Sequence, residues 1–440
     1  MPIPSVCLDA RVRQWTAPFR TCLSKPQYQH FVTVLLGFIL CQEGRTLSGL
    51  ARQIAGGPSV ASLSRFLAQA PWAPTAVAQT WLTRFREQMA PQVQAERERH
   101  RQAQRQARPR RRGRPPAPLV TGYLIGDDST MAKPKGAKMA GLGRHYSTTA
   151  GTQVRGHSLL QGLYVLLGRR CPLAPQLYQQ QAVCQAADVP FRSKVDLLVE
   201  LVQTFAPVAG TRTHVLADSW YGAKRLWRAA RERGFLITTG LKGNRWVRVP
   251  DPEAERGWRW QRLDAYAAGL TADDFTLLDW PRQSDEEPRQ VYMHVLSTRV
   301  RTLYRCQVVI VRPALDAPAS ATRYWASSDL EADPATLLTH ISTRWEVETF
   351  FGDAKDVLGL DQYQLMTTTA LVRFWTLALA AYTLLEEEQA RLSQERQGHV
   401  TIGEARRALQ HCHYRHLLGW IEHAFHTGVD ADTLYERLIA

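Results

Sequence analysis

Hydrophobic positions in the first hundred residues recur every three to four residues, which is the spacing of amphipathic helices. Helices are predicted over 27–42, 46–54 and 60–69, and a Gly-Gly-Pro break separates the last two. A helix pair joined by such a turn fits a helix-turn-helix at 46–69, whose second helix would present Arg65 to DNA. Similar pairs occur in helical bundles that bind no ligand, so both interpretations stay open.

From residue 119 onward, short apolar runs alternate with helical patterns, which predicts an α/β region with a partly parallel sheet. The expected elements, in order, are a strand at 119–126, further glycine-interrupted strands at 154–167, a helix at 195–205, a strand at 214–218, a helix at 223–233 ended by Gly234, and a strand at 235–240. Ligand sites in such sheets form beyond the carboxyl ends of the strands, so Asp128 and Asp218 are expected to lie there. Taken singly, an aspartate at a strand end is usually a turn or cap residue.

Residues 344–358 combine a line of charges with a line of apolar side chains. At about 100° per residue of helix, Arg344, Glu348 and Lys355 project within a narrow arc. The apolar stripe lies about a quarter-turn away and consists of Val347, Phe351, Ala354 and Leu358. A carboxylate between two cations stays ionised, as both a metal ion and a neighbouring phosphate backbone require. The alternative interpretation is an ordinary solvated helix face.

The 440-residue chain carries a formal net charge of +15, which favours a polyanionic partner, nucleic acid before membrane. Its seven cysteines are scattered and form no CxxC pair, so neither a disulfide framework nor a structural zinc site is predicted. The apolar run at 31–41 is too short to span a bilayer, and the N-terminus lacks the order of a secretory signal. We therefore expect a cytosolic protein without a membrane partner.

Nine arginines lie between residues 97 and 114, in a segment with almost no large apolar side chain. Such a segment cannot bury a core and is expected to form a flexible or partly helical linker. Its end, Arg112-Gly-Arg114-Pro, resembles the core of an AT-hook, whose arginines enter the narrow minor groove. Arg110 and Arg111 would add backbone contacts. A solubilising tether between domains is the alternative.

Asp128, Asp218 and Glu348 make a stronger case together than any one of them alone. Three carboxylates that converge on one point repel each other unless a divalent cation lies among them. Ligation by oxygen alone suits Mg²⁺, with Mn²⁺ as a substitute. A pair of such ions can activate a water or a 3′-hydroxyl and stabilise the leaving oxygen in an in-line attack on phosphorus.

These residues resemble the motifs of a DDE transposase of the bacterial insertion-sequence type, over roughly residues 45 to 390. In that family the last acidic residue lies in a helix with the spacing Tyr-(2)-Arg-(3)-Glu-(6)-Lys. Arg344, Glu348 and Lys355 match three of its positions, while the Tyr position holds Ile341. Asp218 matches the second acidic position. The first is ambiguous between Asp127 and Asp128, and Asp128 is narrowly preferred because Asp-Ser-Thr satisfies both forms of the family pattern.

The resemblance implies a metal-dependent enzyme that binds the terminal inverted repeats of a transposon and performs cut-and-paste cleavage and strand transfer. It implies double-stranded DNA as partner, a homodimer on DNA, and a bacterial cytoplasmic, nucleoid-associated location. Arg344 and Lys355 would hold the DNA backbone. Further candidate DNA contacts are Lys133, Lys135, Lys242, Arg245 and, as a platform for a base, Trp325. A non-catalytic DNA-binding regulator and a host nuclease of the same fold are the alternatives.

The fold class that follows is α/β, with an RNase-H-like mixed sheet and flanking helices, a β-rich insertion and an all-helical N-terminal DNA-binding domain. The predicted divisions are a helical domain at 1–94, an arginine-rich linker at 95–118, the first part of the catalytic core at 119–245, the insertion at 246–335, the core with the Glu-bearing helix and the following helix at 336–395, and C-terminal helices at 396–440.

Overall fold

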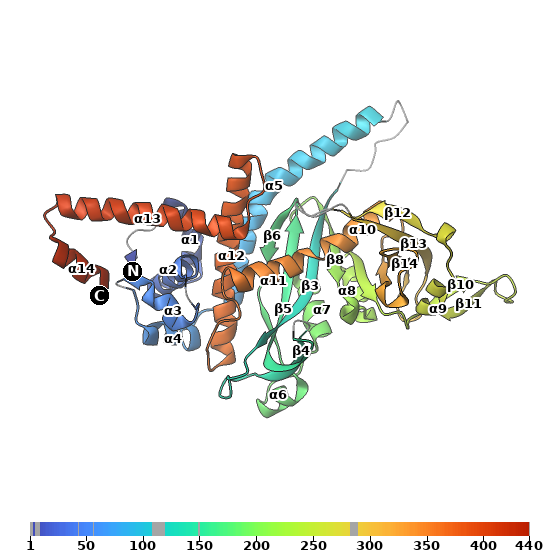
Figure 1. Ribbon diagram of the computed structural model, residues 1–440, viewed down its shortest axis with the longest axis horizontal. Coiled ribbons are helices and arrows are strands. Elements are labelled where there is room, and N and C mark those ends of the chain that lie inside the picture. Colours follow the sequence, from blue (N-terminus) through green and yellow to red (C-terminus); the bar gives the residue numbers. More distant parts are fainter. Residues whose placement is uncertain are drawn as a thin grey trace.

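The structure is a computed structural model that describes residues 3–4, 9–42, 44–55, 57–107, 119–147, 150–281 and 289–439 of the chain. Figure 1 shows an elongated molecule in three parts. Helices from both ends of the chain (blue and red) lie at one end, a large sheet (green) lies in the middle, and further strands (yellow) extend the other end.

A single mixed sheet of eleven strands organises the described part of the chain. Its order is β12-β13-β14-β15-β9-β8-β3-β5-β4, and β6 and β7 also pair with β5. The pairs β3–β8 and β8–β9 are parallel, whereas the other pairs in this sheet are antiparallel. The strands are β3 Val120–Ala132, β4 Gly143–Ser147, β5 Thr152–Leu166, β6 Arg169–Pro172, β7 Gln176–Tyr178, β8 Thr211–Ala217, β9 Leu236–Leu241, β12 Thr276–Asp279, β13 Gln290–Arg299, β14 Arg305–Arg312 and β15 Arg323–Ser327.

Two of the predicted strands are longer than the sequence indicated. The strand expected to end before Asp127 continues as β3 to Ala132, so the aspartate pair lies inside a strand. The glycines expected to interrupt 154–167 lie within the single strand β5. They permit close packing there: a Cβ on Gly156 would lie 2.2 Å from the Met131 carbonyl oxygen, and one on Gly162 would lie 2.6 Å from Leu201 Cδ1.

The two faces of β3 carry different helices. On one face, a Cβ at Gly126 would lie 2.3 Å from Cδ1 of Leu198, in helix α7 (Lys194–Thr204). On the other, the Tyr123 hydroxyl lies 3.1 Å from Nδ1 of His340, in helix α10 (Pro334–Thr343). Because side chains alternate along a strand, the odd-numbered positions 123–127 face α10 and the even-numbered ones face α7.

The helices around the parallel strands form largely where the sequence predicts them. Ser193 caps α7 in a capping box with Asp196. Helix α8 (Lys224–Glu232) ends before Gly234, whose φ of +68° is the left-handed geometry typical of a helix C-terminus. The short helices η2 (Ser219–Tyr221) and α6 (Gln181–Ala186) complete this region.

The strands after β9 belong to the same sheet as the core. β15 pairs with β9, with Trp325 opposite Gly240, so β12–β15 extend the central sheet outward. A separate hairpin, β10 (Trp246–Pro250) with β11 (Trp258–Arg262), and helix α9 (Leu263–Ala268) accompany them. The short helices η3 (Ala272–Asp274) and η4 (Ala319–Ala321) lie in the connections.

The N-terminal helices are α1 Ala10–Thr16, η1 Ala17–Thr21, α2 Lys25–Leu40, α3 Leu47–Arg52, α4 Val60–Ala68 and α5 Pro74–Ala107, and a two-residue pair joins β1 Ile3–Pro4 to β2 Ile54–Ala55. The predicted Thr46 cap is present, with its hydroxyl accepting from the Gly49 N–H. Helix α5 continues without interruption past residue 94, the predicted end of the helical domain, into the first part of the arginine-rich segment.

Helix α12 (Thr368–Arg396) packs between the N-terminal helices and the sheet, where Phe38 contacts Phe374 edge to face. By length and composition α12 could cross a membrane, but 83% of its most apolar window is buried inside the protein. Helices α13 (Ile402–His426) and α14 (Ala431–Ile439) follow it.

Three consecutive glutamates of α12 join segments that are distant in sequence. Arg169 donates two hydrogen bonds to the Glu386 carboxylate, at 2.9 and 2.6 Å, and the Arg170 backbone N–H adds a third at 2.9 Å. Glu387 pairs with Arg84 of α5 at 2.8 Å, and Glu388 pairs with Arg11 of α1 at 2.6 Å. α12 therefore links α1 and α5 to β6 through charge-assisted hydrogen bonds.

Candidate active site

Asp127 lies on β3, and Asp218 directly follows β8, the neighbouring parallel strand. The β3–β8 register pairs Ile125 with Leu216 and Gly126 with Ala217, so its next step places Asp127 beside Asp218. Four residues earlier on each chain segment, the paired residues Tyr123 and His214 face α10. Both aspartates therefore project toward the α10 face of the sheet.

Burial changes the acidity of both carboxyls. Burial, followed by the charges of Asp218 and Asp128, raises the pKa of Asp127 to about 7, although Arg344 acts in the opposite direction. Burial also raises the pKa of Asp218, against a hydrogen bond that its carboxylate accepts from the Trp220 N–H at 2.8 Å. The pair thus resists double ionisation, which is the electrostatic condition that a divalent cation relieves.

Glu348 lies in helix α11 (Glu346–Asp356), which crosses this end of β3. Its carboxylate accepts a hydrogen bond from Arg344 at 2.5 Å, four residues earlier. The same guanidinium lies 3.6 Å from Asp127 Oδ2, through its other terminal nitrogen. Arg344 therefore joins the carboxylate on the helix to the carboxylate on the strand.

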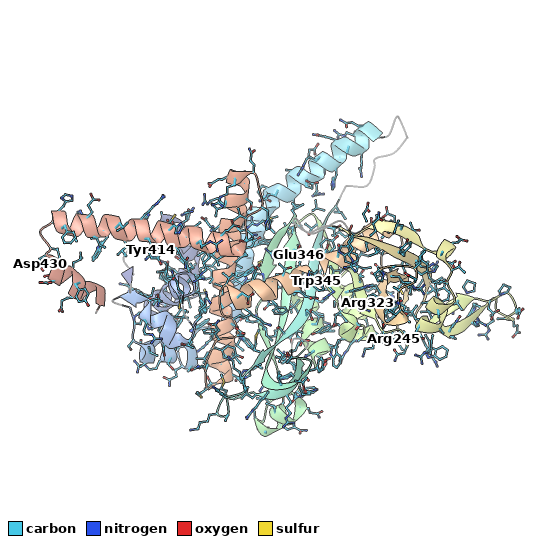
Figure 2. All side chains as sticks on the ribbon, in the orientation of Figure 1. Arg245, Arg323, Trp345, Glu346, Tyr414 and Asp430 are labelled. Atoms are coloured by element: carbon cyan, nitrogen blue, oxygen red, sulfur yellow. The ribbon has the colours of Figure 1, made fainter. Side chains whose placement is uncertain are left out.

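The helix expected from residue 344 onward begins two residues later as α11, and Arg344 and Trp345 form a turn between α10 and α11. Both Arg344 and Trp345 keep right-handed helical dihedrals, but the Trp345 N–H bonds to the Ser342 carbonyl three residues back, which tightens the turn. Trp345, at the start of α11, is half exposed (Figure 2). The predicted apolar stripe is confirmed, because Val347, Phe351, Ala354 and Leu358 are all buried.

The two helices pack on different hydrophobic clusters. Ile341, at the position where the family motif has Tyr, is buried with α10 against the outer strands; this cluster consists of Val291, Met293, Val309, Val311, Leu337, Leu338 and Ile341. Val347 and Phe350 of α11 belong instead to the main core. The side chain at 341 thus serves as a core contact.

Asp128 lies on the opposite face of β3 from Asp127. Its carboxylate accepts hydrogen bonds from Lys194 at 2.5 Å, from the Tyr221 hydroxyl at 2.7 Å and from Ser158 at 3.2 Å. Three donors on α7, η2 and β5 therefore engage this side chain. The two neighbouring aspartates, which sequence could not separate, have different surroundings.

Comparison with protein-family models gives two matches. The model of the DDE superfamily endonucleases matches residues 18–267, and that of the transposase DDE domain matches residues 191–384. The chain belongs to the DDE superfamily of endonucleases. A search of curated proteins finds no match.

Membership in this family confirms the resemblance to a DDE transposase and the predicted class of fold, a large mixed sheet with flanking helices and a helical N-terminal region. DDE nucleases and transposases act on DNA and generally use divalent metal ions. The two matched regions together contain the aspartates of β3, Asp218 and Glu348.

The basic residues predicted to contact DNA in this DDE endonuclease have diverse surroundings. Arg65 and Lys135 are exposed. Lys133 is half-buried; its ammonium group donates to the Tyr363 carbonyl at 2.8 Å and lies over the Tyr363 ring, and burial lowers its pKa. Lys355 is also half-buried, and burial likewise lowers its pKa. Arg110, Arg111, Arg112 and Arg114 lie outside the described residues.

Lys242 and Arg245 lie beside the residues that follow Asp218, around an open pocket of about 500 Å³. The pocket is lined by Ser219, Trp220, Lys242, Asn244, Arg245, Trp246, Arg301 and Thr302. Trp220 is 63% exposed, and the Lys242 ammonium lies 5.7 Å from its ring centroid. Cationic and aromatic side chains around an open pocket suit a phosphate backbone with an unstacked base.

Trp325, on β15, is half-buried and lies under the guanidinium of Arg344, 5.8 Å from the ring centroid. It also packs against the cluster of α10 and the outer strands. Its position brings it close to Arg344, which contacts Asp127 and Glu348.

Sequence reasoning missed three residues of this region. Trp220 and Tyr221 follow Asp218 directly, so their position beside a strand-end aspartate was a usable signal. Lys194 was not identifiable, because its contact with Asp128 joins residues 66 positions apart through the fold.

Proposed function

We propose that the protein is a cut-and-paste transposase that binds the terminal repeats of its element and transfers their 3′ ends to target DNA. The observation that carries this proposal is the placement of Asp127, Asp218 and Glu348 at one end of the sheet, on the face covered by α10 and α11. Their donor set is oxygen only, which fits Mg²⁺ or Mn²⁺.

We propose Asp127 as the first metal-binding residue, in place of Asp128, which the sequence narrowly favoured. Asp127 shares its face with Asp218 and contacts the Arg344 that holds Glu348, whereas Asp128 is occupied by Lys194 and Tyr221. Two bound Mg²⁺ ions would activate the attacking hydroxyl and stabilise the leaving oxygen.

The chain's own residues would position the DNA. The Arg344 guanidinium, beside both Asp127 and Glu348, is placed to exchange a carboxylate for a phosphate oxygen of the bound strand. Lys242 and Arg245 would hold the strand next to Asp218, with Trp220 stacking on a base. Lys355 and Trp325 would support the backbone on either side. Positioning and charge stabilisation supply most of the rate in phosphoryl transfer.

The deciding experiment is an assay of cleavage and joining with end DNA, target DNA and Mg²⁺. We expect cleaved ends that become joined to target, and loss of both products in Glu348→Gln. Cleavage without joining would instead identify a nuclease. Full activity of the Glu348→Gln protein would contradict the catalytic assignment. We expect paired ends to require a homodimer, and the enzyme to act in the bacterial cytoplasm on double-stranded DNA.

The arginine-rich linker gives a separate prediction on binding. Replacing Arg110, Arg111, Arg112 and Arg114 by Ala should weaken DNA binding and flatten the plot of log K against log salt. Each phosphate contact contributes about 0.9 to that slope, so the expected reduction is about 3 to 4. The measurement is fluorescence anisotropy at several salt concentrations. The control is Arg228→Ala, because Arg228 is an exposed arginine paired with Glu232 on α8. An unchanged slope would show that the linker does not touch DNA.

A further inference from the structure

A buried cluster of two histidines and one aspartate lies behind the catalytic carboxylates. His214 is on β8, four residues before Asp218; His340 is on α10, four residues before Arg344; Asp329 follows β15. Their exposed fractions are 0%, 4% and 7%. One ligand atom of each lies within 4.8 Å of the other two.

The hydrogen bonds around His214 leave one of its two ring nitrogens with an unused lone pair. Thr238 donates its own hydroxyl proton to Ser327 at 2.9 Å, so its oxygen accepts from Nε2 of His214 at 2.8 Å. A neutral imidazole that donates through Nε2 carries a lone pair on Nδ1. This Nδ1 is buried and has no hydrogen-bond partner.

In His340 the two ring nitrogens have the opposite roles, because Nδ1 has a partner and Nε2 has none. Its Nδ1 lies 3.1 Å from the Tyr123 hydroxyl, while its Nε2 is buried without a hydrogen-bond partner, 3.9 Å from Asp329 Oδ2. The rings of His214 and His340 lie 4.0 Å apart between centroids. Buried polar atoms are nearly always satisfied, so two orphaned ring nitrogens beside one carboxylate require an explanation.

We propose that His214 Nδ1, His340 Nε2 and a carboxylate oxygen of Asp329 bind a Zn²⁺ ion. Two imidazoles and a carboxylate are typical zinc ligands, and bonds of about 2.0–2.1 Å in a tetrahedron place ligand atoms about 3.4 Å apart. The 3.9 Å between His340 and Asp329 therefore needs a contraction of only about half an ångström. Water or the second Asp329 oxygen completes the four ligands.

The groups outside this ligand set fit the assignment. Thr238 and Tyr123 hold the outer nitrogens of the two imidazoles, as the partners of metal-bound histidines usually do. Arg212 donates to Asp329 Oδ2 at 2.9 Å and the Glu331 N–H donates to Oδ1 at 3.4 Å; these donors orient the carboxylate, and each oxygen keeps a further lone pair. The cysteine spacing gave no zinc site, and this one uses no cysteine.

The zinc ion joins three elements that carry the active site. It binds the strand that leads into Asp218, the segment after the strand of Trp325, and the helix that leads into Arg344 and Glu348. Because the site uses imidazole, it differs in metal preference from the oxygen-only catalytic site. Its existence does not depend on the proposed transposase activity.

The test is the zinc content of untagged full-length protein, measured by elemental mass spectrometry after dialysis against a weak chelator. We expect about one Zn²⁺ per chain in the wild type. His340→Gln and His214→Asn should each lose it. Two controls should retain it: Glu348→Gln, at the catalytic site, and His294→Gln, whose ring nitrogens contact Tyr266 and the Asp274 carbonyl.

A second measurement keeps the proposal testable if a variant folds poorly. Removing zinc from the wild type with a strong chelator should lower Tm, and added Zn²⁺ should restore it, because a ligand that binds only the folded state stabilises it. Wild-type protein that takes up no zinc when Zn²⁺ is supplied would overturn the proposal. Unchanged zinc content in both histidine variants would also overturn it.

Discussion

Asp127→Asn protein is expected to lose about 10³-fold in the rate of Mg²⁺-dependent cleavage, the upper end of the range of about 10²–10³-fold for removing a group that stabilises transition-state charge. Asp128→Asn should lose only about 10–100-fold, as for a group that supports the metal ligands from outside. The reason is the alternation of β3, which sends Asp127 to the face of Asp218 and Glu348 and Asp128 to the face of Lys194.

The measurement is single-turnover cleavage of labelled end DNA, with each variant at saturating concentration. Circular dichroism and DNA affinity serve as controls, because both variants should fold and bind DNA. Asp218→Asn should match Asp127→Asn. The reverse order, with Asp128→Asn inactive and Asp127→Asn active, would transfer the first ligand to Asp128 and refute the argument from strand alternation.

Glu386→Ala should lower the free energy of unfolding by about 3–5 kcal/mol, the usual loss when one member of a buried ion pair is removed. Glu386 is 3% exposed and accepts hydrogen bonds from the Arg169 guanidinium and the Arg170 N–H. The substitution leaves the Arg169 guanidinium and the Arg170 N–H without their acceptor, at a position where the carboxylate is almost fully buried.

Urea unfolding followed by tryptophan fluorescence measures this effect. The matched control is Glu395→Ala on the same helix. Glu395 pairs with Arg391, but its side chain is 57% exposed, so its removal should change stability by no more than about 1 kcal/mol. Equal effects of the two substitutions would show that the Glu386 pairs contribute no more than a surface contact.

Much of the catalytic end could be predicted from sequence because its signals are local. A short apolar strand that closes on Asp218, a helix ended by Gly234 and the charged line of Arg344 and Glu348 all depend on near neighbours. Asp218 directly follows β8 as expected, whereas the aspartates of β3 lie inside a strand that continues to Ala132, and α11 with Glu348 crosses this strand.

What could not be predicted depends on contacts distant in sequence. The motif allows either Asp127 or Asp128, and only the packing of Leu198 and His340 on opposite faces of β3 distinguishes them. Gly156 and Gly162 resembled strand breaks because the Met131 backbone and Leu201, which come close to them, are not apparent from the sequence. The turn at Trp345 likewise follows from two separate hydrophobic clusters.

The turn at Arg344 and Trp345 separates two helices that pack on different parts of the protein. α10 packs on the outer strands through Leu338 and Ile341, whereas α11 packs on the core through Val347. Arg344 lies between the two helices. The position of the guanidinium relative to Asp127 and Glu348 therefore depends on how both helices pack.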